Sequence, residues 1–268
     1  MARSVSAKVV LLAVAAALAG TLHGCGFLSD TDETVGWSAN KLYEESRNAM
    51  DDGNYTRAIK YFEKLEARYP YGSYAQQAQL DVAYAYFKDN ESAQAVAACD
   101  RFIKLHPNHP NVDYAYYLKG LTNFNENTSL FAGLTSEDPS ERDPKAARDS
   151  FDAFKELALR FPNSKYTPDA IARMKYLVNA LAHHEVMVAR WYMRLGAYVA
   201  AGNRAQYALK IYPETPATEE ALALMVGAYD GMRITDLRDD AKRVLQTNFP
   251  KSAFLRRAEN GDWKSLWN

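Results

Sequence analysis

The chain has 268 residues, 48% of them hydrophobic, and a formal net charge of −1 at pH 7. A near-neutral chain lacks the basic surface with which proteins bind phosphate backbones, so we expect no nucleic-acid partner. The apolar fraction is enough to bury a core. The long helical periods, with few β-branched runs, predict an all-α protein.

The first residues have the pattern of an export signal. Arg3 and Lys8 are positive, and the apolar run over residues 9–22 is shorter than the roughly 20 residues that span a membrane. The run ends in Leu-His-Gly-Cys at residues 22–25, which resembles the lipobox of bacterial lipoproteins. That resemblance implies cleavage before Cys25 and a covalent lipid on its sulfur, with no other cofactor. An ordinary signal peptide followed by a free cysteine is the alternative.

The residue after the cysteine bears on the destination. Gly26 stands where an Asp would resemble an inner-membrane retention signal. Its absence implies passage to the outer membrane, where we expect a lipid-anchored protein on the periplasmic face. Several acyl chains together give a stable anchor. Residues 1–24 are expected to be a cleaved lipoprotein signal peptide, and residues 25–36 a lipidated tether.

The stretch from Gly53 to Pro70 reads as the turn and second helix of a helical hairpin. Gly53 and Asn54 suit a turn, and Pro70 stops the helix. Between them, apolar residues recur at three- and four-residue steps and make one face of a helix: Tyr55, Ala58, Ile59, Phe62 and Leu65.

An aromatic residue or His before Pro recurs along the chain, at Tyr69-Pro70, His106-Pro107, Phe161-Pro162, Tyr212-Pro213 and Phe249-Pro250. Recurrence of this kind predicts a solenoid rather than a single-core domain. The pattern Gly-x-Tyr-x-x-Ala, at Gly53 and again at Gly196, resembles the second half of a tetratricopeptide repeat. We therefore expect a right-handed superhelical solenoid of five tetratricopeptide-like helical hairpins over residues 37–250.

Two segments interrupt or follow the repeats. An insertion at about residues 123–144 lies in the third repeat, and a loop of that length is usually functional or disordered. A surface flap and a partner-docking loop are both open. The C-terminal tail, residues 251–268, contains Phe254, Trp263 and Trp267. It packs on the last repeat or offers an apolar contact to a partner.

Signatures of catalysis are missing from the sequence, which lacks a Walker loop, G-x-S-x-G and H-E-x-x-H. His183, His184 and Glu185 are adjacent on a predicted helix, so they fan out instead of converging on a metal. Cys99 falls on a core position, where a cysteine is usually inert packing. We expect no enzyme, no catalytic residues and no metal site.

Tyrosines are concentrated on the predicted first helices and at the helix ends beside them: Tyr69, Tyr71, Tyr74, Tyr84, Tyr86, Tyr114, Tyr116 and Tyr117. First helices of stacked hairpins line a concave face, and tyrosine gives a large contact area and a hydroxyl at little entropic cost. Such a groove suits an extended peptide. The alternative is inter-repeat packing, and we expect more than half of these rings in the core.

Segments along essentially the whole mature chain resemble the ComL family, the tetratricopeptide lipoproteins of the β-barrel assembly machinery. They are residues 52–55 (DGNY), 68–72 (RYPYG), 100–103 (DRFI), 109–111 (HPN), 120–123 (GLTN), 142–144 (RDP), 161–164 (FPNS) and 196–199 (GAYV). The resemblance implies a non-catalytic outer-membrane scaffold. Its implied role is to bind the C-terminal signals of unfolded outer-membrane proteins and to couple these clients to BamA for folding and insertion.

The same resemblance assigns parts of the chain to partners. It implies that the C-terminal repeats dock to a periplasmic domain of BamA, that small partner lipoproteins bind alongside, and that the N-terminal repeats contact substrate. The family's pattern places candidate substrate-binding residues at Tyr69, in Arg68-Tyr69-Pro70, and at Arg204, in Asn203-Arg204. The alternative function is a repeat lipoprotein adaptor acting on peptidoglycan or in DNA uptake.

Overall fold

The structure, a computed structural model, describes residues 32–128, 144–258 and 263–267, without the side chains of residues 125–128, 264 and 265. The chain divides into two compact units, residues 1–38 and 39–268. In the described part of the first unit, the Asp32 carboxylate accepts hydrogen bonds from the backbone N–H and the hydroxyl of Thr34, at 3.1 and 2.7 Å. Cys25 and most of the expected tether lie outside the described residues.

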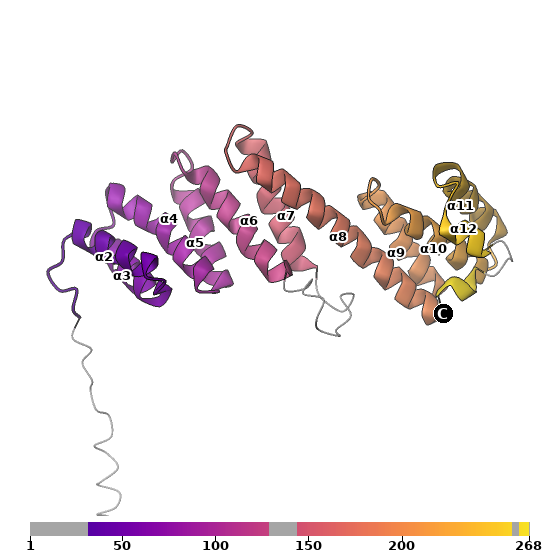
Figure 1. The fold of residues 1–268 in the computed structure, drawn as a ribbon, viewed down its shortest axis with the longest axis horizontal. Helices are drawn as coiled ribbons and strands as arrows, with labels where there is room; N and C mark the ends of the chain where they lie inside the picture. Colours follow the sequence, from indigo (N-terminus) through magenta and orange to yellow (C-terminus); the bar gives the residue numbers. More distant parts are fainter. Residues whose placement is uncertain (1–31, 129–143, 259–262, 268) are drawn as a thin grey trace, which may run out of the picture. The chain divides into compact units, whose positions relative to one another are not determined.

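The described part of the second unit is helical, and no β-strand occurs in it. The elements are α2 (Ala39–Asp51), α3 (Tyr55–Arg68), α4 (Ser73–Lys88), α5 (Ser92–Leu105), α6 (Val112–Thr128), α7 (Lys145–Arg160), α8 (Thr167–Arg194), α9 (Tyr198–Ile211), α10 (Thr218–Gly231), α11 (Thr235–Asn248), α12 (Ala253–Arg257) and the 3₁₀ turn η4 (Lys264–Trp267). Figure 1 shows them in order.

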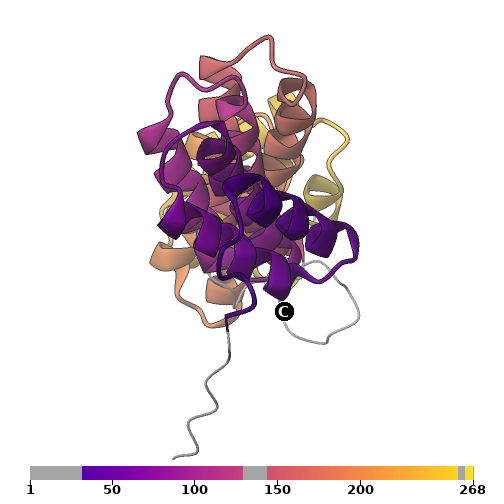
Figure 2. The ribbon, with the colours of Figure 1, turned by 90° about the vertical axis from the view of Figure 1, so that its left-hand side faces the viewer.

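Each helix from α2 to α11 packs against the next, which gives five hairpins: α2/α3, α4/α5, α6/α7, α8/α9 and α10/α11. Figure 2 views the same helices from the side of the indigo pair, α2 and α3. First helices also contact one another, α2 with α4, α4 with α6 and α8 with α10. This arrangement confirms the expected all-α helical-repeat solenoid.

The turns inside four of the five hairpins share one geometry. The key residue of each has a positive φ, at Gly53 (73°), Asn90 (62°), Gly196 (70°) and Arg233 (62°). The following N–H donates to the carbonyl five residues back, as from Asn54 to Ala49 at 2.8 Å. This is the Schellman arrangement, which favours glycine because a Cβ is strained at positive φ. The predicted turn at Gly53 and Asn54 is confirmed.

The junction between hairpins is equally regular. Each residue before the recurring prolines ends a second helix with φ and ψ near −130° and 60°: Tyr69 (−131°, 66°), His106 (−130°, 56°), Phe161 (−129°, 62°), Tyr212 (−129°, 56°) and Phe249 (−132°, 64°). Each donates its N–H to the carbonyl four residues back at 2.8 Å. Proline disfavours the α conformation of the residue before it, so the pair ends the helix.

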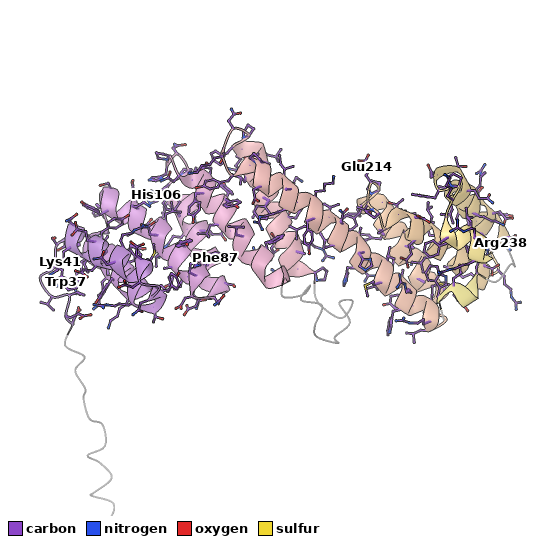
Figure 3. The ribbon with its side chains drawn as sticks, in the orientation of Figure 1. Trp37, Lys41, Phe87, His106, Glu214 and Arg238 are labelled. Carbon is purple, nitrogen blue, oxygen red and sulfur yellow. The ribbon has the colours of Figure 1, made fainter. Side chains whose placement is uncertain are left out.

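Small residues let the helices of a pair approach. In α3, the small residue Ala58 and the larger residues Phe62 and Leu65 are all fully buried. At Gly120 in α6, an added Cβ would lie 2.4 Å from the Phe154 ring of α7. In the last hairpin, Arg238 occupies the position that Ala58 has in the first, five residues after the turn residue. It pairs with Asp230 at 3.3 Å and lies at the outer end of the chain's helices (Figure 3).

Helix α8 joins two core clusters because it is about twice as long as its neighbours, 28 residues against 14 in α9. Leu177 and Leu181 belong to the cluster built with α6 and α7, and Ala189 and Met193 to the cluster built with α9 to α11. The first helix of the fourth hairpin thus runs well past the length of its partner, from Thr167 to Arg194.

The C-terminal tail packs on the last repeats. Helix α12 contacts α10, and η4 contacts both α8 and α10. Trp263 and Trp267 are each 4% exposed, and the Phe254 and Trp267 rings stack at 5.6 Å. A Cβ at Gly227 would lie 3.0 Å from the Trp267 Nε1, so the glycine makes room for the indole. Of the two interpretations left open, packing on the last repeat is the one observed.

The expected insertion begins later than predicted, because α6 continues through Thr128. Helix α7 starts at Lys145, directly after Pro144. Residues 129–143 lie outside the described residues, so the choice between a flap and a docking loop stays a prediction.

Candidate peptide-binding site

Three tyrosines gather at the junction of the first two hairpins. Tyr69 ends α3 and is 37% exposed, Tyr71 is 91% exposed, and Tyr74 in the first turn of α4 is 41% exposed. The Tyr74 hydroxyl donates to the Asn40 Oδ1 at 2.6 Å, and its ring lies 5.5 Å from that of Tyr43. The junction therefore offers aromatic surface fixed from beneath, which suits contact with a peptide.

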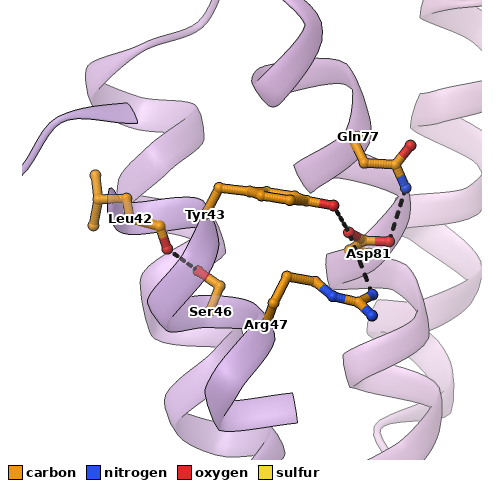
Figure 4. A network of polar contacts seen from close by, with 6 residues as sticks. All are labelled: Leu42, Tyr43, Ser46, Arg47, Gln77 and Asp81. Carbon is orange, nitrogen blue, oxygen red and sulfur yellow. Dashed lines mark hydrogen bonds and ion pairs between the residues drawn. The ribbon is translucent and has the colours of Figure 1, made fainter. Parts of the chain in front are cut away.

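A polar network on α2 and α4 supports this junction (Figure 4). The Asp81 carboxylate, 8% exposed, accepts hydrogen bonds from the Tyr43 hydroxyl at 2.9 Å and the Gln77 amide at 3.0 Å. Arg47 lies 3.9 Å from the same carboxylate. Burial raises the pKa of Asp81, and the three donors partly offset it. The network ties the first helices of two hairpins together below Tyr74.

The tyrosines of the first helices are less deeply buried than expected. Tyr116 is buried at 9%, while Tyr84, Tyr86, Tyr114 and Tyr117 are half-buried at the rim of the core. Two of them use their hydroxyls inside the protein. The Tyr117 hydroxyl donates to Asp169 at 2.7 Å, and that of Tyr86 donates to Glu63 at 2.5 Å. These hydroxyls stabilise contacts between helices.

Arg204 lies in an ion-pair cluster that joins three helices. Its guanidinium on α9 donates to the Glu185 Oε2 of α8 at 2.9 Å, and Arg148 of α7 lies 3.7 Å from the other carboxylate oxygen. The Glu185 side chain is 1% exposed, whereas those of Arg204 and Arg148 are 45% and 46% exposed. Burial raises the pKa of the neighbouring Tyr212, and Arg148 counteracts this shift.

Sequence reasoning missed Glu185 as the centre of this cluster and considered it only as a neighbour of His183 and His184. A signal was present, because Leu177, Leu181, Glu185 and Ala189 repeat every four residues on one face of α8. The other three residues of that face are buried core residues. A carboxylate among them predicts a buried, paired charge.

The two candidate residues lie in different hairpins, Tyr69 in the first and Arg204 in the fourth. Cys99 is fully buried, and burial raises the pKa of its thiol to about 12. Among the described residues, we find no group of three or more His, Cys, Asp or Glu side chains that could hold a metal ion. None of the helices described there has the length and apolar character to cross a membrane.

The described residues form a row of helical hairpins with an exposed aromatic junction in the first two and an internal ion-pair cluster further on, which defines the class of helical-repeat proteins. Residues 37–245 match the family described as "Outer membrane lipoprotein" (YfiO). The chain belongs to this family.

Curated relatives carry the name "Outer membrane protein assembly factor BamD". The protein of Neisseria meningitidis serogroup B is 49% identical over 97% of this chain and 100% of its own length. That of Xylella fastidiosa is 38% identical over 92% of this chain and 84% of its own. That of Vibrio cholerae is 37% identical over 85% and 93%. A solved tetratricopeptide domain, that of P58(IPK), matches at 13% identity with a TM-score of 0.41, over 85% of this chain and 58% of that chain, which is too distant to add to the argument.

Proposed function

We propose that this protein is a lipid-anchored scaffold of the β-barrel assembly machinery on the periplasmic face of the outer membrane. It receives unfolded outer-membrane proteins and couples them to BamA for folding and insertion, without catalysing a reaction itself. The observation that carries the proposal is the 49% identity to an assembly factor BamD over 97% of the chain. The row of helical hairpins supports it, because such folds present extended surfaces for polypeptides.

The anchor is the lipid on Cys25. The short apolar run before it and the Leu-His-Gly-Cys sequence support this assignment. A Cys25→Ser protein should no longer fractionate with the outer membrane, since it lacks the thiol that carries the lipid. A variant that still fractionates with the outer membrane would overturn the anchor.

Client binding is assigned to the aromatic junction around Tyr69. Its side chain is 37% exposed, and the bond that ends its helix runs from the backbone N–H to the Leu65 carbonyl, so Tyr69→Ala keeps this bond and a thermal melt checks that the variant is folded. We expect this variant to bind the C-terminal peptide of an outer-membrane barrel protein about tenfold more weakly, the loss of one aromatic contact. Tyr176→Ala, at a tyrosine of α8 that is 42% exposed and belongs to neither candidate contact, is the matched control. Equal binding by the Tyr69→Ala variant and the parent would remove Tyr69 from the site.

Arg204 is assigned a second client contact, made by the part of its guanidinium that Glu185 leaves exposed. Because Arg204→Ala also removes a partner of buried Glu185, its effect on folding must be separated from its effect on binding. Arg204→Lys keeps a positive charge near Glu185 but loses the planar fork that recognises a carboxylate. If both variants bind the peptide as the parent does once corrected for the folded fraction, Arg204 is purely structural.

The partners are BamA, through the C-terminal repeats, and the small lipoproteins of the same machinery. A pull-down with the tagged, lipidated protein from envelope extract tests this assignment. Enrichment of BamA supports the proposal. Enrichment of peptidoglycan-binding or pilus components without BamA would instead favour the adaptor for the cell wall or for DNA uptake.

A further inference from the structure

A cavity of about 340 Å³ lies at the C-terminal end of the chain, away from both candidate client contacts. Helix α8, helix α10 and the tail segments α12 and η4 form its walls. Its charged lining consists of three arginines and one carboxylate, and its apolar lining includes two aromatic rings: Arg190, Arg194, Arg257, Glu220, Phe254 and Trp267.

The positive charge of this cavity is only partly neutralised. The Arg190 Nε donates to the Glu220 Oε1 at 2.9 Å, and its Nη2 contacts the same oxygen. Arg194 follows one turn later on α8, and Arg257 ends α12. Within the part of the chain that the structure describes, neither Arg194 nor Arg257 forms an ion pair. Two guanidinium charges therefore remain in excess, although the whole chain has a net charge of −1.

The cavity is held by packed walls. Trp267 is 4% exposed and stacks on Phe254 at 5.6 Å, with the ring planes 23° apart. The Glu220 side chain is 17% exposed and fixes Arg190 on the opposite side. Glu220 therefore holds Arg190 in place, while Arg194 and Arg257 line the cavity with exposed side chains.

We propose that this cavity binds a carboxylate that a partner polypeptide presents next to an apolar side chain. Guanidinium groups match carboxylates with two parallel hydrogen bonds. The volume is near the lower end of ligand pockets and suits one or two side chains. The Phe254 and Trp267 rings beside the arginines favour a peptide, whose apolar side chain can pack on them. A phosphate headgroup has no apolar group next to its charge. The proposal adds a docking point to the C-terminal repeats and does not depend on Tyr69 or Arg204.

The test uses the full lipidated protein in neutral detergent and three labelled peptides of one length, followed by fluorescence anisotropy. The first contains Glu-Phe-Glu with a C-terminal amide, the second contains Gln-Phe-Gln with an amide, and the third contains Gln-Phe-Gln with a free C-terminal carboxylate. We expect the first or third peptide to bind about tenfold or more tightly than the second. The tighter of the two identifies the carboxylate as a side chain or a chain end.

Arg194→Gln and Arg257→Gln should each weaken the acidic peptide about tenfold, whereas Arg243→Gln, at an arginine of α11 whose side chain is 74% exposed, should not. Thermal melts confirm that the variants are folded. Equal binding of all three peptides, or unchanged binding by both cavity variants, would overturn the proposal. So would displacement of the peptide by glycerol 3-phosphate at lower concentration than by glutarate, since the cavity would then prefer a phosphate.

Discussion

Two buried carboxylates, one in each half of the repeat array, are stabilised in different ways. Asp81, between the first two hairpins, is bonded to a hydroxyl and an amide, with Arg47 no closer than 3.9 Å. Glu185, at the junction of α7, α8 and α9, is deeper and lies between two guanidinium groups, at 2.9 and 3.7 Å. Asp81 is held mainly by neutral donors, whereas Glu185 is held by two guanidinium groups that act through their charge. The N-terminal network therefore depends little on charge, and the C-terminal cluster depends on it strongly.

The difference also bears on recognition. Near Asp81, the polar groups lie beneath exposed tyrosines and leave an aromatic surface for a client. Near Glu185, the arginine assigned to client binding is already engaged in an internal pair. Arg194 and Arg257, which form no ion pair within the described residues, line the cavity near the C-terminal end. We therefore expect aromatic contacts to dominate in the first hairpins and ionic contacts in the last.

The largest effect should come from removing both partners of Glu185. Arg148→Ala with Arg204→Ala leaves a buried carboxylate without a cation, and we expect the free energy of unfolding to fall by about 3–5 kcal/mol. Adding Glu185→Leu should recover most of this loss, because the uncompensated charge is gone. Urea denaturation measures both changes. A loss below about 1 kcal/mol in the double variant would contradict the description of Glu185 as charge-dependent.

A smaller effect is expected at the other carboxylate. Asp81→Ala removes an acceptor from Tyr43 and Gln77, both of which reach solvent, and should lower the free energy of unfolding by about 1–2 kcal/mol. Arg47→Ala should cost less than about 1 kcal/mol, because the pair is long and Arg47 is partly exposed. If Arg47→Ala costs as much as Asp81→Ala, the two carboxylates are stabilised alike.

Substitutions at two equivalent hairpin turns, one in each half, should change the free energy of unfolding in opposite directions. Gly53 and Arg233 occupy equivalent turn positions with φ of 73° and 62°. Gly53→Ala should lower the free energy of unfolding by about 1 kcal/mol, and Arg233→Gly should raise it by up to about 1 kcal/mol. Thermal denaturation of the two variants side by side is the measurement. Shifts of the same sign would show that the two turns are not equivalent.

The smallest effect is a pH dependence at Asp81. Burial raises its pKa in the folded state above the usual value of 3.8, so the folded protein holds this proton more tightly than the unfolded chain. The resulting stability is fully present below the usual pKa and is lost as the pH rises through the raised value. Asp81→Asn cannot titrate, so the stability of the parent relative to this variant should decrease as the pH rises from below 3.8 through the raised pKa. A difference that grows with pH would contradict the raised pKa.

Features set by local backbone chemistry could be predicted from the sequence. The five residues before proline end their helices with nearly the same dihedral angles, because proline restricts the preceding residue whatever lies around it. Gly53 likewise follows from the positive φ of its turn. The apolar period of α3 correctly identified Ala58, Phe62 and Leu65 as buried.

Features that depend on long-range packing could not be predicted. The Arg148–Glu185–Arg204 cluster combines residues from three helices, and nothing local specifies which arginine meets the carboxylate. The tail was open to two interpretations because its position depends on the room that Gly227 leaves for Trp267. The cavity between Arg194 and Arg257 exists only because the tail folds back onto α8 and α10.

The central claim is that this protein assists the assembly of β-barrel proteins in the outer membrane. The most direct measurement is the amount of folded barrel protein in the outer membrane, detected by its heat-modifiable migration on gels, in cells depleted of this protein. The account predicts that folded barrels decline as the protein is depleted and are restored by the parent chain. Barrel levels that stay normal throughout depletion would contradict it.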